Sequence, residues 1–86
     1  MLSIIARLVD EEAKLAVPAA QVAPRADLYA LGLTPYTAIR TLLAIEREFG
    51  VEFARHRLNR RTMATLASIA ASLDEALSPV AVPRPA

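Results

Sequence analysis

The chain has 86 residues, a formal net charge of +1 and 55% hydrophobic residues. That length fits one small domain with a modest core. The balanced charge and scarce aromatic residues argue against nucleic acid as a partner. The absence of cysteine excludes disulfides, thiolate metal sites and a cysteine nucleophile, and it favours a cytoplasmic protein. No apolar run is long enough to span a bilayer, so no membrane association is expected.

The first predicted helix covers roughly residues 3–15, with Ser3 as its N-terminal cap. Ile5, Leu8 and Val9 recur at helical spacing and form its apolar face. Beyond this helix, residues 17–26 contain two prolines, and their apolar residues follow no regular spacing, which predicts a long loop.

The loop is expected to end in an ordered segment, residues 27–33. Its three leucines are predicted to turn inward: Leu28, Leu31 and Leu33.

The second predicted helix, residues 35–49, has the clearest boundaries. Thr34 is a good N-cap, and proline is favoured at the next position because its missing N–H has no helical partner there. Gly50 provides the stop, since glycine accepts the left-handed conformation. One side of this helix is expected to face the core: Ile39, Leu42, Leu43 and Phe49, with Tyr36 and Ile45 near its edges.

A basic connector, residues 54–61, follows a short extended link in which Phe53 is expected to fill the core. The connector is predicted to hold one short helical turn. The last helix is expected to begin near Thr62 and to end around Leu77. Its apolar stripe is Met63, Leu66, Ile69, Ala70 and Leu73.

These elements predict an all-α fold: a small bundle of four helices, three long and one short, with a long first loop. The helical domain is expected to span residues 1–77. Residues 78–86 carry three prolines and are expected to form a flexible tail.

This layout resembles the acyl carrier protein family, whose members carry intermediates of fatty acid, polyketide and peptide synthesis. The matching residues are Asp27-Leu28 and Leu31-Gly32-Leu33 before the second helix, and Leu42-Leu43-Ala44-Ile45-Glu46, Glu48-Phe49-Gly50-Val51 and Phe53 within and after it. Three further elements, Tyr29, residues 58–62 and residues 64–69, resemble small stand-alone bacterial carriers, including those charged with amino acids by synthetase-like ligases. The resemblance implies an acyl-carrier-protein-like bundle.

The family's attachment motif, Gly-Leu-Asp-Ser-Leu, is replaced here by residues 32–36, Gly-Leu-Thr-Pro-Tyr. The resemblance therefore places Pro35 where the family carries 4'-phosphopantetheine on serine, with Thr34 and Tyr36 beside it. Proline has no hydroxyl to esterify. Thr34 and Thr37 have hydroxyls, but Thr34 is better explained as the helix cap. No cofactor is therefore expected.

We interpret the chain as a carrier-like protein that has lost its attachment site and acts as a partner-binding or regulatory module. The implied partner is a protein such as a ligase, synthase or transferase. Candidate partner-binding residues lie on the second helix and in the connector: Tyr36, Arg40, Arg47, Arg55, Arg57, Arg60 and Arg61. The alternative is a genuine acyl or aminoacyl carrier that is modified elsewhere, or a variant whose serine has been replaced.

An enzyme is not expected, because no triad, dyad or metal cluster is present. His56 is the only histidine, and the arginines on either side disfavour a metal cation there. It is interpreted as an exposed histidine without an acid or base partner. Acidic residues one or two positions apart, 10–12 and 46 with 48, point apart on a helix and are interpreted as solvated. Tyr36 is expected to pack at least half in the core.

Overall fold

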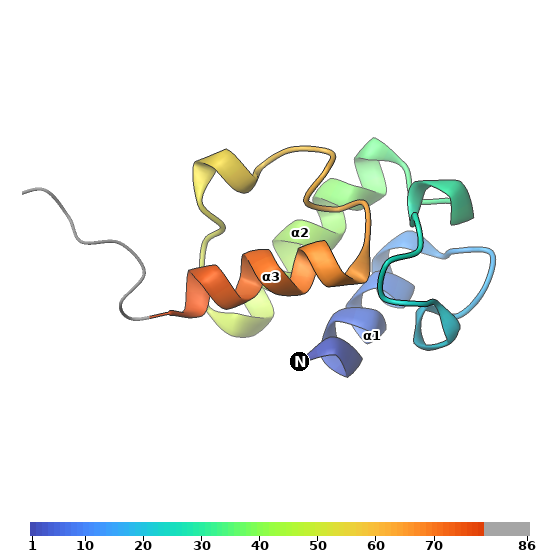
Figure 1. Ribbon diagram of the computed structural model, residues 1–86, viewed down its shortest axis with the longest axis horizontal. Coiled ribbons are helices and arrows are strands. Elements are labelled where there is room, and N and C mark those ends of the chain that lie inside the picture. The colour runs from blue at the N-terminus through green and yellow to red at the C-terminus, as the bar shows by residue number, and fades with distance from the viewer. Residues whose placement is uncertain (79–86) are drawn as a thin grey trace, which may run out of the picture.

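The structure is a computed structural model that describes residues 1–78, in which three α-helices are joined by segments that contain three 3₁₀ turns (Figure 1). The all-α prediction is confirmed. The predicted short fourth helix is a single 3₁₀ turn, η3, Arg55–Arg57. Helix α3 ends at Leu77, where the last helix was expected to end. The predicted flexible tail lies, apart from its first residue, outside the described residues.

Helix α1, Leu2–Ala13, begins one residue earlier than predicted and ends two residues sooner. Met1 occupies the cap position without a side-chain hydrogen bond, so the predicted Ser3 cap is wrong. Lys14 adopts a left-handed conformation (φ 52°) and ends the helix. The predicted apolar face is correct, because its three members are buried: Ile5, Leu8 and Val9.

The long loop contains two 3₁₀ turns, η1 at Ala19–Gln21 and η2 at Tyr29–Leu31. Leu28 and Leu33 are buried and Leu31 is partly buried, which confirms their inward direction. The backbone N–H of Leu28 donates to the carbonyl of Ala64 at 2.7 Å, so this loop is fastened to the segment before the last helix.

Helix α2, Pro35–Phe49, has the predicted boundaries. Thr34 and Thr37 form a reciprocal capping box, in which each side-chain oxygen accepts from the other residue's backbone N–H. Gly50 ends the helix in the left-handed conformation, with φ 66°.

The predicted core side of α2 is only partly correct: Leu42 and Phe49 pack partly buried against the core, but Ile39 and Leu43 do not. Ile39 and Leu43 are 57% and 51% exposed, and Tyr36 is 68% exposed rather than half in the core. The buried side consists mainly of small residues: Ala38, Thr41, Ala44 and Ile45. Ile39 and Leu43 are therefore left on the outer side of the helix.

Helix α3, Leu66–Leu77, begins four residues after the predicted start. Thr65, not Thr62, is its cap and forms a capping box with Ser68. Thr62 is buried in the preceding turns. The predicted stripe is otherwise correct: Met63, Leu66, Ile69 and Leu73 are buried and Ala70 is partly buried.

Helix α1 packs against both α2 and α3, and side chains from all three helices meet in one core. In Figure 1 the connector arches between the end of α2 and the start of α3. Phe53 is buried at its beginning, as predicted. Within residues 1–78, no helix combines the length and apolar character needed to cross a bilayer.

Candidate functional site

The start of α2 holds the residue that the sequence singles out. Pro35 is the first residue of the helix and is exposed. Its ring is pre-organised for that position and leaves no orphan N–H. Because its side chain is a hydrocarbon ring, it offers no nucleophile and no atom to which a phosphate could be esterified.

The two neighbouring hydroxyls are occupied by the capping box. The Oγ1 atoms of Thr34 and Thr37 lie 2.9 Å apart, and Thr34 Oγ1 accepts from the N–H of Thr37 at 3.1 Å. Thr37 Oγ1 accepts from the N–H of Thr34 at 2.9 Å and lies 3.2 Å from the carbonyl of Thr34. Both oxygens therefore stabilise the helix start.

The outer side of α2 forms an apolar and basic surface, which we call the α2 face. Its members follow one another at helical spacing, and all are exposed: Tyr36, Ile39, Arg40, Leu43 and Arg47. Exposed large apolar residues that lie in a row commonly mark an interaction site. The structure thus places three residues predicted to bind a partner on one surface.

The two arginines of the α2 face differ in their surroundings. Arg40 pairs with Glu12 of α1 at 3.0 Å and lies over the ring of Tyr36, 5.8 Å from its centroid. Its hydrogen bonds with Tyr36 and then with Glu12 raise the pKa of Arg40. Arg47 has no carboxylate partner within residues 1–78 and presents its charge to solvent.

The four arginines of the connector divide into two pairs. Arg57 is held by Glu75 of α3, with Nε and Nη2 at 3.4 and 3.3 Å from its two oxygens. Arg60 lies over the ring of Tyr29, 3.7 Å from its centroid. Arg55 and Arg61 are exposed, and neither forms an ion pair in the described part of the chain.

His56 has an acidic partner that the sequence did not reveal. Its Nε2 lies 3.4 Å from Oε1 of Glu75, so the expectation of an unpartnered histidine is wrong. The imidazole is exposed, as predicted. The hydrogen bond from Arg57, followed by the Arg57 and His56 charges, lowers the pKa of Glu75 against the opposing effect of its desolvation. This cluster fixes η3 to α3.

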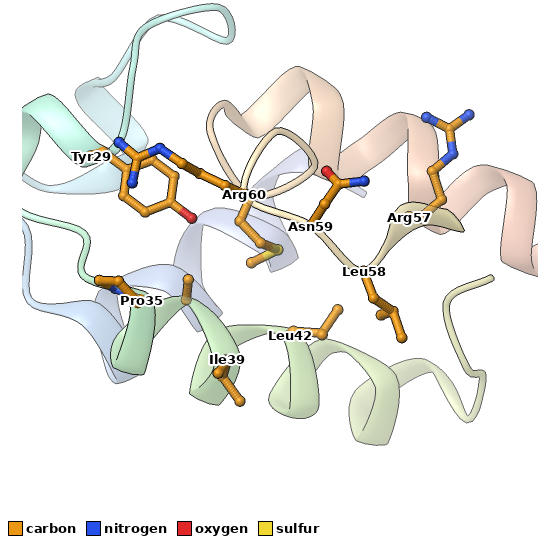
Figure 2. A pocket seen from close by; sticks show the side chains of 10 residues that line it. Tyr29, Pro35, Ile39, Leu42, Arg57, Leu58, Asn59 and Arg60 are labelled. Carbon is orange, nitrogen blue, oxygen red and sulfur yellow. The ribbon is translucent and has the colours of Figure 1, made fainter. Parts of the chain in front are cut away.

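A groove of about 430 Å³ opens between α2 and the connector (Figure 2). It is lined by Tyr29, Pro35, Ala38, Ile39, Leu42, Arg57, Leu58, Asn59, Arg60 and Met63. In Figure 2, Leu58 points from the connector toward Leu42 of α2. The groove could not be predicted from the sequence, because its walls come from segments distant in the chain.

The carboxylates near α2 are engaged in structural contacts. Glu46 accepts from the backbone N–H of Phe53 at 2.7 Å, and Glu48 pairs with Arg7 of α1 at 3.5 Å. No group of three or more acidic, histidine or cysteine side chains within residues 1–78 could hold a metal ion.

Comparison with known proteins gives consistent matches. The family described as "Phosphopantetheine attachment site" matches residues 3–73. An aminoacyl carrier protein of Agrobacterium fabrum (strain C58 / ATCC 33970) is 33% identical over 69 residues, which cover 80% of this chain and 83% of that protein.

Three solved structures share the fold. One is a chain in the crystal structure of an engineered Bradyrhizobium japonicum glycine:[carrier protein] ligase complexed with carrier protein from Agrobacterium tumefaciens and AMP. It matches with a TM-score of 0.81 and 31% identity, over 86% of this chain and 99% of that chain. The carrier-protein match in the corresponding complex with ATP has a TM-score of 0.80 and 30% identity, over 85% of this chain and 95% of that chain. A solution structure of an Agrobacterium tumefaciens protein matches with a TM-score of 0.67 and 31% identity, over 86% of this chain and 89% of that chain.

Proposed function

The chain belongs to the phosphopantetheine attachment site family, and we propose that it is a member that binds a carrier-protein ligase without carrying the arm itself. The family consists of carriers rather than enzymes, in agreement with the expectation that this chain does not catalyse a reaction. The proposal is supported by one observation above all. Pro35 stands at the first position of α2, where the resemblance places the modified serine.

The neighbouring threonines support the same proposal. Attachment of a phosphate ester to Thr34 or Thr37 would remove a hydroxyl proton and crowd an oxygen that caps α2. The alternative, a genuine carrier modified at another residue, would therefore have to open the helix start. We propose that the arm is absent and that the scaffold is kept for docking.

The α2 face is the proposed docking surface. It presents the Tyr36, Ile39 and Leu43 side chains to solvent, and Arg40 and Arg47 flank them. A partner that covers this surface needs an apolar contact region with carboxylates near its rim. Two symmetrical copies of the face would bring like charges together, so a different protein is the better partner. The positive surface extends into the connector through Arg55 and Arg61, which are exposed and form no ion pair within the described residues.

The comparisons suggest the kind of partner. The similar Agrobacterium tumefaciens carrier was crystallised with a glycine:[carrier protein] ligase. We propose that a ligase of this kind binds the present chain, and that the chain acts as a competitor or regulatory subunit rather than as a substrate. The expected cytoplasmic location stays a prediction.

A competition experiment tests the partner. The Bradyrhizobium ligase is supplied with glycine, ATP and the holo form of the Agrobacterium carrier, and this chain is added at increasing concentration. We expect the rate of carrier loading to fall, and an increase in holo carrier to restore it. No inhibition, together with no binding of this chain to the ligase in calorimetry, would contradict the proposed partner.

Charge and apolar variants test the surface. The double change L43E/R47E is expected to weaken binding at least tenfold, because it places carboxylates opposite an acidic rim. Arg55→Glu with Arg61→Glu tests the connector in the same way. Arg25→Glu, in the long loop on another part of the chain, is the matched control and is expected to leave binding unchanged. Equal binding by all variants would contradict docking through the α2 face.

A further inference from the structure

One arginine links the exposed ring of Tyr36 to helix α1. Arg40 lies one helical turn after Tyr36 on α2, and its Nη1 donates to the Tyr36 hydroxyl at 3.4 Å. Its Nε donates to Oε1 of Glu12, near the end of α1, and its Nη2 lies 3.0 Å from the same oxygen. All three nitrogens of the guanidinium are therefore engaged within the chain, on partners from two helices.

The consequence of this contact is geometric rather than energetic. The side chains of Arg40 and Glu12 are 52% and 21% exposed, and an ion pair so open to solvent adds little to the free energy of unfolding. A planar guanidinium whose donors are fixed on two partners has little freedom to turn, however. Tyr36, which is otherwise surrounded largely by solvent, thereby gains a fixed neighbour.

The same contact divides the charges of the α2 face. Glu12 compensates the charge of Arg40 within the fold. Arg47 has no carboxylate partner within residues 1–78. A carboxylate on a docking protein is therefore attracted chiefly to Arg47.

From this arrangement we propose that Glu12 is a positioning residue of the α2 face. It holds Arg40, and Arg40 holds Tyr36, so the ring meets the partner already ordered. Tyrosine is enriched among the residues that dominate binding energy, and a side chain ordered in advance loses less conformational freedom on association. The partner then needs an apolar seat for the Tyr36 ring and a carboxylate opposite Arg47. This inference rests on the proposed function and names the contact groups that the partner must supply.

The first experiment needs no partner. NMR relaxation of the Tyr36 ring and exchange of the Arg40 Nε–H with water are measured in the full chain. Glu12→Gln keeps the size of the side chain and removes its charge, so it should speed the Nε–H exchange several-fold and increase the motion of the ring. Glu11→Gln is the matched control, because Glu11 lies on the same helix but pairs with Arg7, and it should change neither signal. Unchanged signals in Glu12→Gln, or equal changes in Glu11→Gln, would overturn the positioning role.

The second experiment measures binding to the Bradyrhizobium ligase over a range of salt concentrations. The double change E12Q/R40Q removes one charge of each sign and keeps the net charge. It should weaken binding about threefold to tenfold, because the Tyr36 ring must then be ordered on association, and it should leave the salt dependence unchanged. Arg47→Gln should flatten the salt dependence, because it removes the charge offered to the partner.

A Tyr36→Ala background separates positioning from direct contact. There E12Q/R40Q should have almost no further effect, since no ring is left to be held. An equal loss of affinity in both backgrounds, or a flattened salt dependence for E12Q/R40Q, would show that Arg40 itself contacts the partner and would overturn the proposal. If the ligase does not bind the unaltered chain, the proposed function and the partner contacts both fail, whereas the NMR signals still decide whether Glu12 holds Tyr36.

Discussion

Thr34 and Thr37 carry the helix start that Pro35 begins. Their reciprocal hydrogen bonds satisfy two backbone N–H groups that would otherwise lack partners at the N-terminus of α2. Pro35 supports the same helix start, because at the first helical position its missing N–H leaves no donor without a partner. The Thr34 and Thr37 hydroxyls thus serve helix capping, and modification of either one would compete with that role.

The capping role of Thr34 is testable by stability. Thr34→Ala is expected to lower the free energy of unfolding by about 1 kcal/mol, because the N–H of Thr37 loses its acceptor. Urea denaturation measures the change. Thr34→Ser keeps the capping oxygen and is expected to recover most of the loss. Equal stability of the alanine and serine variants would contradict the cap.

Glu75 provides a pH-dependent contact. Arg57 and His56 hold its carboxylate, and its pKa lies below the ordinary value of 4.5. A lowered folded-state pKa stabilises the fold above the unfolded value, and the contribution disappears as the pH falls through the folded value. We therefore expect Glu75→Gln to lower the Tm at neutral pH and to match the unaltered chain in strong acid.

A thermal unfolding series between neutral and strongly acidic pH measures this convergence. Asp74→Asn is the matched control, since Asp74 is exposed on the same helix and forms no ion pair within residues 1–78. The Tm difference between Asp74→Asn and the unaltered chain should not change with pH in the way expected for Glu75→Gln. A Glu75→Gln deficit that persists unchanged in strong acid would show that the ion pair is not its cause.

At the scale of elements, the start of α3 depends on Ser68. Its hydroxyl donates to the carbonyl of Thr62 at 2.7 Å and lies 3.0 Å from the hydroxyl of Thr65. It also accepts from the N–H of Thr65 at 3.2 Å. One side chain therefore joins the helix to the turns that precede it.

Ser68→Ala is expected to destabilise the chain by about 1–2 kcal/mol, because it leaves partly buried polar groups without partners. Urea denaturation and amide exchange near residues 62–66 measure the global and local effects. Ala71→Ser is the control: it exchanges the same two residue types at an exposed site of α3 and should change stability much less. Ser68→Ala without loss of stability or local protection would contradict this role.

The same contact explains why the predicted start of α3 was wrong. Both Thr62 and Thr65 have the chemistry of a cap, and both precede apolar residues. Ser68 distinguishes them, because it forms the capping box with Thr65 while its hydroxyl donates to the Thr62 carbonyl. By contrast, Pro35 and Gly50 determine the α2 boundaries by local chemistry, and that prediction is confirmed.

The orientation of α2 was predicted less well, for a related reason. Of the four large apolar residues assigned to the core, Leu42 and Phe49 pack partly against it, but Ile39 and Leu43 are exposed. The fully buried side is Ala38, Thr41, Ala44 and Ile45. Close packing against α1 requires small side chains, and that requirement depends on the neighbouring helix. The exposure of Ile39 and Leu43, and hence the α2 face, could not be inferred from helical period alone.

At the scale of the whole molecule, α1 lies against both other helices and the core is shared by all three. The helical order and the family were recognisable from the sequence because they depend on long patterns. The groove was not, because it joins η2, α2 and the connector. The contacts of Arg57 and Arg60 likewise depend on Glu75 and Tyr29, which are distant in the sequence.

The most direct test of a non-carrying scaffold is an intact mass measurement. The chain is incubated with coenzyme A and a phosphopantetheinyl transferase that modifies the Agrobacterium carrier under the same conditions. We predict that the carrier gains the mass of one phosphopantetheine group and that this chain keeps its original mass. A phosphopantetheine adduct on this chain, at Thr34, Thr37 or any other residue, would contradict the claim that it does not carry the arm.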